Sequence, residues 1–343
     1  MTCKRSVKWG LGAVLAALSA LSGALAAPTL NGAGATFPYP LYSKWFDVYA
    51  QKTGVRINYQ SIGSGGGIKA VQAHTVDFGA SDAPLSDEEI KQMPAPVVHI
   101  PTVAGAVAVV YNLPGVGTGL KLDGATLANI YLGKIKNWND ARIVALNRGL
   151  RLPSRAIAVA HRSDGSGTSY IYTNYLAAVS PEWKTKVGAG KSVNWPAGVG
   201  GKGNEGVAGL VRQLPGGIGY VELAYALQNH LTYAAMRNAS GRFTAPNLQT
   251  TAAAAAGAVP AMKRDIRVSI VNAKGPNVYP IAGFTYLLAY RQLGDAERGK
   301  ALIGFLNWAL RDGQKLAPAL MYVPLPAGVV ALNQRTVKTL RAG

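Results

Sequence analysis

A nearly continuous apolar run from Val97 to Tyr111 constrains the fold more than any other part of the sequence. It lacks the polar alternation of a strand that faces water on one side. Such a run is typical of a strand buried on both faces, as in a parallel sheet that helices cover. The chain must therefore supply helices that shield this strand on both sides, and we predict an α/β fold.

Strand-like and helix-like segments alternate along the rest of the chain, as α/β architecture requires. We expect strands at 55–59, 77–80, 218–221 and 284–290, and helices at 67–73, 125–132, 169–179 and 300–310. Ser86 and Glu89 have the spacing of a capping box at a further helix start. The length of 343 residues predicts two domains at roughly 150 residues each. The pattern does not tell which strands share a sheet.

The first 26 residues have the features of a secretory signal peptide. Lys4, Arg5 and Lys8 precede an uncharged apolar stretch, and Ala24-Leu25-Ala26 is an A-x-A cleavage site. The alternative is a membrane anchor, but the apolar stretch is shorter than the ~20 residues that a span needs. We therefore expect cleavage near Ala26, an exported protein, and a mature net charge of +16.

Several classes of chemistry are excluded by what the sequence lacks. A single cysteine, Cys3, lies in the predicted signal peptide, so the mature chain has neither a disulfide nor a thiolate metal site. Four scattered histidines form no metal-binding motif. Gly198 to Gly203 fits GxGxxG, but no strand is expected directly before it. No GxSxG motif surrounds a serine. We expect no metal, no cofactor and no enzymatic activity.

Three glycine-containing segments at expected loop-to-helix junctions carry the functional signal. They are Gly34 to Pro38, Gly63 to Gly67 and Arg162 to Ser169. Small residues at a helix start let backbone N–H groups point at a ligand, where the helix dipole favours an anion. Ser and Thr hydroxyls add donors, and an arginine adds a fork that fits a tetrahedral oxyanion. Together these segments predict an oxyanion site.

Each of these residues also has a simpler structural interpretation. Ser64 could be a helix N-cap, and so could Ser166 or Thr168. Arg162 could be a surface arginine that pairs with Asp164. Asp82, which follows an expected buried strand, could be a turn residue. The combination favours a site more strongly than any single segment does.

The combination resembles a known family. The segments GAGATFPYPLYSKW, YQSIGSGGGIKAVQAHTVDFGASDAPLSDEE, HRSDGSGTSYIYTNYL and GGKGNEGVAGLVRQLPGGIGYVELAYA are similar to those of the periplasmic phosphate-binding proteins, the solute receptors of phosphate ABC transporters. The similarity is dense from about residue 30 to 230 and thinner afterwards, and the Ala-rich stretch near 235–275 departs from it. It implies a monomeric receptor that binds inorganic phosphate and delivers it to a membrane permease with its ATPase.

The fold implied by this resemblance has two lobes, each with a central mixed β-sheet flanked by helices, joined by a two-segment hinge. Lobe I would comprise 27–104 plus 284–343, and lobe II would comprise 105–283. The resemblance also implies the phosphate contacts. They are Thr36, Phe37 through its backbone N–H, Ser64, Asp82, Arg162, Ser166, Gly167 through its backbone, and Thr168. Asp164 would hold the Arg162 guanidinium in place.

Proton counting gives Asp82 a specific role in this interpretation. Phosphate keeps at least one O–H near neutral pH, whereas sulfate has none. An ionised carboxylate among donors accepts that proton but repels sulfate. Asp82 is therefore the predicted selectivity residue. Receptors for other oxyanions, such as sulfate, arsenate or a phosphonate, remain the alternative.

The positive charge of the mature chain has more than one interpretation. A positive field can steer a small anion to its site. Arg142, Arg148, Arg151 and Arg155 are close in sequence, which is also a feature of polyanion-binding proteins. The remaining basic residues are spread out without interleaved aromatics or a nucleic-acid motif, so we expect no nucleic-acid partner. An acidic environment outside the cell is a third explanation for few carboxylates.

Overall fold

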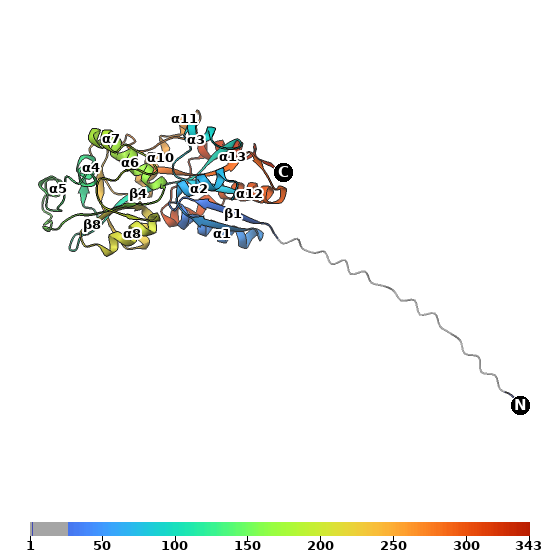
Figure 1. Cartoon of the computed structure of the whole chain (residues 1–343), viewed down its shortest axis with the longest axis horizontal. Coiled ribbons are helices and arrows are strands. Elements are labelled where there is room, and N and C mark those ends of the chain that lie inside the picture. The colour runs from blue at the N-terminus through green and yellow to red at the C-terminus, as the bar shows by residue number, and fades with distance from the viewer. Residues whose placement is uncertain (1, 3–26) are drawn as a thin grey trace.

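The computed structural model describes Thr2 and residues 27–343 (Figure 1). The predicted signal peptide and its cleavage site therefore lie almost wholly outside the described residues. Within the described part of the chain, no helix is long and apolar enough to cross a membrane.

A mixed nine-stranded sheet forms the centre of the molecule. Its order is β2-β1-β3-β12-β4-β8-β6-β7, and β9 also pairs with β4. The strands are β1 (Thr29–Gly34), β2 (Arg56–Ser61), β3 (Phe78–Ser81), β4 (Val97–Asn112), β6 (Ala158–Arg162), β7 (Val199–Gly201), β8 (Gly217–Glu222), β9 (Thr232–Tyr233) and β12 (Ala282–Tyr290). Two small sheets are formed by β5 (Lys121–Leu122), β10 (Ala235–Arg237) and β11 (Phe243–Thr244), and by β13 (Gln292–Leu293) and β14 (Arg341–Ala342).

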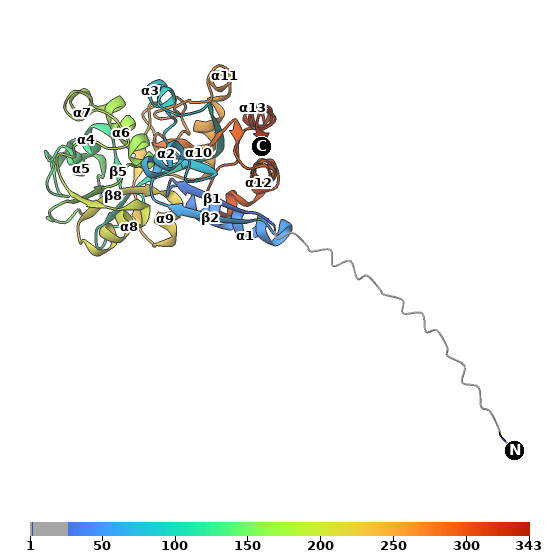
Figure 2. The same ribbon diagram turned by 45° about the vertical axis from the view of Figure 1, so that its right-hand side comes forward.

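Helices flank this sheet, as Figures 1 and 2 show from two directions. They are α1 (Tyr39–Thr53), α2 (Ser64–Gln72), α3 (Asp87–Lys91), α4 (Gly124–Tyr131), α5 (Ala141–Leu146), α6 (Gly167–Val179), α7 (Pro181–Lys186), α8 (Gly203–Gln213), α9 (Leu223–Gln228), α10 (Leu248–Ala256), α11 (Val259–Met262), α12 (Ala296–Ala309) and α13 (Ala327–Val337), with short 3₁₀ turns at Gly313–Leu316 and Pro318–Leu320. Among other contacts, α2 packs on β1 and β3, α8 packs on β6 and β8, and α13 packs on β4. The α/β prediction is confirmed.

The apolar run from Val97 to Tyr111 lies in the long strand β4. Every residue between Val97 and Asn112 is buried, as predicted. Its neighbours differ from the parallel arrangement that we expected, because β12, β8 and β9 all run antiparallel to it. An apolar run reports burial on both faces but not strand direction, which depends on the connections. Parallel pairing occurs instead on either side, in β2-β1-β3 and in β8-β6-β7.

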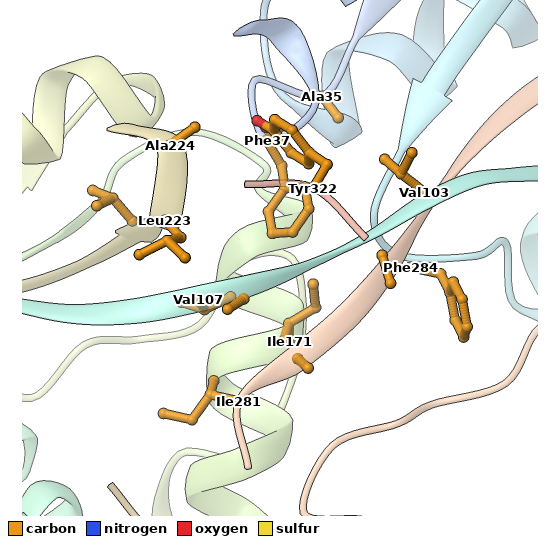
Figure 3. Close-up of a cluster of buried hydrophobic side chains, with 14 of the residues drawn as sticks. Ala35, Phe37, Val103, Val107, Ile171, Leu223, Ala224, Ile281, Phe284 and Tyr322 are labelled. Atoms are coloured by element: carbon orange, nitrogen blue, oxygen red, sulfur yellow. The ribbon is translucent and has the colours of Figure 1, made fainter. Parts of the chain in front are cut away.

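The pairing of β4 with β12 links the two sides of the molecule. Residues 97–106 of β4 pair with β12, and residues 107–112 pair with β8. Gly105 faces Gly283 in the β4–β12 ladder. A Cβ on Gly105 would lie 2.6 Å from the Phe37 ring, and one on Gly283 would overlap Ile171. The absence of side chains therefore lets Phe37 and Ile171 pack directly on the strands, within the apolar cluster of Figure 3.

Predicted helix starts differ from observed ones where glycines lie at the start. The helix expected at 67–73 is α2, which begins at Ser64 and so includes the glycines in its first turn. Glycine costs helix stability, but a Cβ on Gly67 would lie 2.5 Å from Gly34, so the close approach of α2 to β1 requires it. The capping box of Ser86 and Glu89 is present at α3, as predicted.

A buried histidine on β4 supports the loop after β3. The Nε2 atom of His99 accepts a hydrogen bond from the Leu85 N–H at 3.0 Å, and His99 is only 6% exposed. Burial, with a smaller contribution from the nearby Arg267 charge, lowers the pKa of His99 to about 4; Asp265 and Glu89 oppose this shift. The neutral imidazole is therefore the form that the fold stabilises.

We predict that His99 makes the protein less stable in acid. Because its pKa is lower folded than unfolded, its stabilising contribution is complete above pH ~6.5 and is lost as the pH falls toward about 4. That loss amounts to at most about 3.5 kcal/mol, at about 1.4 kcal/mol per pKa unit. Urea unfolding at several pH values should show a smaller acid loss for His99→Gln, whose side-chain oxygen accepts the same bond without titrating. Parallel stability curves would contradict this role.

Candidate anion-binding site

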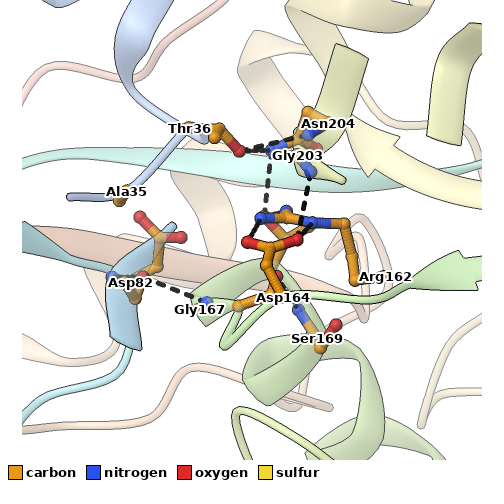
Figure 4. Close-up of polar contacts among 12 residues, drawn as sticks. Ala35, Thr36, Asp82, Arg162, Asp164, Gly167, Ser169, Gly203 and Asn204 are labelled. Carbon is orange, nitrogen blue, oxygen red and sulfur yellow. Dashed lines mark hydrogen bonds and ion pairs between the residues drawn. The ribbon is translucent and has the colours of Figure 1, made fainter. Parts of the chain in front are cut away.

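Loops from distant parts of the sequence converge beside the paired strands β4 and β12, a place that we call the β4–β12 crossing (Figure 4). The Gly65 N–H donates to the Gly165 carbonyl at 2.7 Å, which joins the second and third predicted segments. The α8 start joins the first and third segments, because Asn204 contacts both Thr36 and Thr168. The nine predicted site residues therefore belong to one buried cluster. Helices α2, α6 and α8 all begin there, with their N-terminal dipoles directed toward it.

The first loop is anchored through its carbonyl groups. The Tyr225 hydroxyl donates to the Thr36 carbonyl at 2.7 Å, and the Tyr322 hydroxyl donates to the Phe37 carbonyl at 2.6 Å. The Phe37 N–H has no acceptor among the described residues. The Phe37 ring is buried against Tyr322, with ring centroids 6.3 Å apart. Phe37 thus fixes the loop through its side chain and leaves its amide free to donate.

Ser64 is not a helix cap. The N-cap of α2 is Gly63, and Ser64 is its first helical residue. The Ser64 hydroxyl oxygen instead accepts from the Gly167 N–H at 3.0 Å and from the Asp82 N–H at 3.2 Å. Ser64 therefore ties the start of α6 to the loop after β3.

Ser166 and Thr168 have different roles at the start of α6. Ser166 is the N-cap, with its hydroxyl accepting from the Ser169 N–H at 2.9 Å, so the capping interpretation holds for this residue. Thr168 does not cap the helix. Its hydroxyl oxygen lies 3.3 Å from an Arg162 terminal nitrogen and 3.1 Å from the Asn204 side-chain nitrogen, and both of these donate to it.

Arg162 and Asp164 form a buried pair and not a surface one. The Arg162 Nε donates to one Asp164 oxygen at 2.7 Å and a terminal nitrogen donates to the other at 2.5 Å. The Arg162 side chain is 1% exposed. Burial would raise the pKa of Asp164, but the Arg162 guanidinium and the Gly203 N–H hold that pKa below its ordinary value. The carboxylate stays ionised and orients the guanidinium.

Asp82 is a buried acceptor and not a surface turn residue. It is 3% exposed, and one of its oxygens accepts from the Thr285 hydroxyl at 2.8 Å. Thr285 lies where the β4–β12 register shifts, and such bulges re-aim side chains at functional sites. Burial raises the pKa of Asp82 to about 7, against the lowering effects of Thr285, Arg162 and Ser64. The carboxyl group can therefore exchange a proton near neutral pH.

Sequence reasoning missed Asn204 and the glutamate next to it in the network. Asn204 is fully buried in the first turn of α8, and its side chain accepts from the Glu222 N–H at 2.8 Å. Glu222 is also fully buried, and burial raises the pKa of its carboxyl group well above the ordinary value. A signal was present, since the GGKGNEG segment places glycines before a helix as the other three segments do. The segment fits GxGxxG and is among those that resemble the family, but neither observation assigned a site residue within it.

Comparisons with known proteins show the family. A family model described as "PBP superfamily domain" matches residues 20–312. The phosphate-binding protein PstS of Xylella fastidiosa is 50% identical over 302 residues, covering 88% of this chain and 82% of the relative. PstS of Pasteurella multocida is 47% identical over 314 residues, covering 91% of each chain. The chain belongs to the PstS phosphate-binding protein family.

Solved structures bear out the fold. A high-affinity periplasmic phosphate-binding protein solved with bound phosphate matches with a TM-score of 0.70 at 24% identity, over 90% of this chain and 93% of that one. The phosphate-binding protein of Stenotrophomonas maltophilia matches with a TM-score of 0.69 at 21% identity, over 90% and 93%. The resemblance to the family and the periplasmic binding protein fold, both predicted from sequence motifs, are thereby confirmed.

Proposed function

We propose that this protein is a receptor that binds inorganic phosphate in a cleft between two lobes and delivers it to an inner-membrane ABC permease with its ATPase. The observation that carries the proposal is a buried cluster of N–H and O–H donors beside the buried carboxyl group of Asp82. The PstS relatives, which are named as phosphate-binding proteins, support it. The protein would act by binding, without catalysis, as a monomer and with no nucleic-acid partner.

The contact residues in this proposal are those that the family motifs imply. Arg162 supplies the fixed charge, and the Phe37 amide supplies a backbone donor. The family motifs also imply the Gly167 amide, which in this structure donates to the Ser64 hydroxyl at 3.0 Å. The hydroxyls supply further donors, and Asp82 supplies the acceptor for the phosphate proton. The remaining contacts are Thr36, Ser64, Ser166 and Thr168. Asp164 orients Arg162, as its two hydrogen bonds to the guanidinium support.

We further propose that the lobes divide at the β4–β12 crossing, with lobe I at 27–104 plus 284–343 and lobe II at 105–283. The boundary residues lie opposite one another, since Ala104 pairs with Phe284 and Gly105 with Gly283. In this division the Lys191–Glu89 ion pair, at 2.6 Å, joins the two lobes beside the site. Two crossing strands would then form the hinge.

Calorimetric titration of the mature protein, stripped of ligand, tests the main proposal. We expect one-to-one phosphate binding at pH 7 with little heat from sulfate. Receptors for sulfate, arsenate or a phosphonate are the second candidate, since donors alone fit any tetrahedral oxyanion. Tight binding of another oxyanion with no phosphate binding would replace the proposal by that alternative.

We predict that Arg162→Ala weakens phosphate binding by roughly 1.5 kcal/mol or more, because a charge-assisted hydrogen bond is lost. Arg162→Lys keeps the charge but not the planar guanidinium group, so its phosphate affinity should lie between those of Arg162→Ala and the parent protein. Arg142→Ala is the matched control, since this exposed arginine pairs with Asp140 away from the site. Titration calorimetry on samples with unchanged thermal unfolding measures the effect. An affinity of Arg162→Ala within a few tenths of a kcal/mol of the parent would place Arg162 outside the pocket.

We predict that Asp82→Asn lowers the ratio of phosphate to sulfate affinity by roughly tenfold or more, because the amide no longer repels sulfate or accepts a phosphate proton as a carboxylate does. Competition titrations at pH 8, above the Asp82 pKa of about 7, should show the largest effect because the parent carboxyl group is ionised there. Asp140→Asn serves as the control. An unchanged ratio would remove Asp82 from the selectivity role.

A further inference from the structure

Asn204 makes more polar contacts at the site than its position in a helix requires. Its side-chain nitrogen donates to the Thr36 hydroxyl at 2.7 Å and to the Thr168 hydroxyl at 3.1 Å. Its backbone N–H also donates to Thr36, at 3.2 Å. Asn204 thus joins two of the predicted contact residues, which come from opposite sides of the crossing. Figure 4 shows it above the Arg162–Asp164 pair, next to Thr36.

The orientation of the Asn204 amide follows from the backbone of β8. The Glu222 N–H, which can only donate, faces the Asn204 side chain at 2.8 Å. The atom that meets it must therefore be the oxygen, because an NH₂ group cannot accept. The nitrogen, with its two hydrogens, is consequently turned toward the two hydroxyls. Asn204 is 0% exposed, so bulk solvent does not reach this amide.

This orientation determines what the two hydroxyls can offer to a ligand. A hydroxyl has one hydrogen to donate and two lone pairs that accept. Thr36 accepts twice from Asn204, and Thr168 accepts from Asn204 and from Arg162. With both lone pairs used in each case, the hydroxyl hydrogen is the group that remains for a further partner. Both threonines become donors, which is the polarity that an anion requires.

Ser64 shows the same arrangement with backbone partners. Its oxygen accepts from the Gly167 and Asp82 N–H groups, so its hydrogen also remains available. Three hydroxyls at the site are therefore each saturated as acceptors by N–H donors. Only for the two threonines is a donor supplied by an uncharged side chain, Asn204, that substitution can change.

We propose that Asn204 is a positioning residue that fixes the Thr36 and Thr168 hydroxyls as hydrogen-bond donors and thereby makes the pocket selective for anions. This inference rests on the proposed phosphate function and deepens it. Asn204 acts through the two threonines, and its amide carries no charge that could attract the ligand directly. A carboxylate at this position would reverse the arrangement, since it would accept from both hydroxyls and turn their hydrogens away from the ligand.

Two substitutions test the polarity argument by phosphate titration. We expect Asn204→Ala, which leaves the hydroxyls unconstrained, to weaken binding by about tenfold. We expect Asn204→Asp to weaken it by about 100-fold or more at pH 8, because both donors are lost and a charge is added. The Asn204→Asp loss should shrink relative to the parent as the pH is lowered and the introduced carboxyl group is protonated. Equal affinities for the two variants at pH 8 would overturn the polarity argument.

A double-mutant cycle separates positioning from a merely structural role. In a Thr36→Val, Thr168→Val background no hydroxyl remains to be oriented, so adding Asn204→Ala should change phosphate affinity by less than about threefold. A purely structural effect would instead carry over in full from the parent background, and that result would overturn the proposal. Thermal unfolding of each variant verifies that the folded protein is being titrated.

The control for added charge is Asn129→Asp, because Asn129 lies on α4 and its side chain donates to the Ala125 carbonyl of the same helix. Its phosphate affinity should stay within about twofold of the parent. The parent titration also separates the two proposals. A parent protein that binds no phosphate would sink the proposed function itself, whereas tight parent binding with unaltered Asn204 variants would sink only the role of Asn204.

Discussion

The antiparallel pairing of β4 with β12 is the constraint on which the rest of this structure depends. Near one end of this ladder Gly105 faces Gly283, and neither carries a side chain. Phe37 of the first site loop packs against Gly105, and Ile171 of helix α6 packs against Gly283. Bulkier residues at either position would push these elements away from the strands. The crossing therefore places the loops that carry the donors close together.

The same ladder also supplies the surroundings of the acceptor. The ladder's register shift at Thr285 lets the Thr285 hydroxyl donate to Asp82. His99 on β4 accepts a hydrogen bond from Leu85, which lies three residues after Asp82. Thr285 thus holds the Asp82 carboxyl group, and His99 holds the loop that carries it. Its burial in this position is what raises the pKa of its carboxyl group to about 7. A carboxyl group whose pKa lies near 7 can share a proton with a ligand that titrates in the same pH range.

At the site Arg162 forms an ion pair with Asp164, whereas the buried carboxyl groups of Asp82 and Glu222 have no ion pair among the described residues. Asp164 neutralises Arg162 through two hydrogen bonds and receives a third from Gly203. Burying an arginine without such a partner would be costly. The Arg162–Asp164 pair has little net charge, although it holds the guanidinium in one orientation. In the proposed function, most of the attraction for an anion then comes from amides, hydroxyls and helix N-termini. This division of roles explains why so many neutral donors are needed.

The sequence by itself determined the α/β class, the burial of β4, the capping box at α3 and the family, because each depends on local periodicity or on contiguous motifs. Only the tertiary structure decided that the neighbours of β4 are antiparallel, that the glycines after Ser64 lie inside α2, and that Asn204 contacts the candidate site residues. Those features arise from contacts between residues far apart in the chain, such as Asn204 with Thr36. No local pattern encodes such a contact, since it exists only when the sheet brings the two loops together.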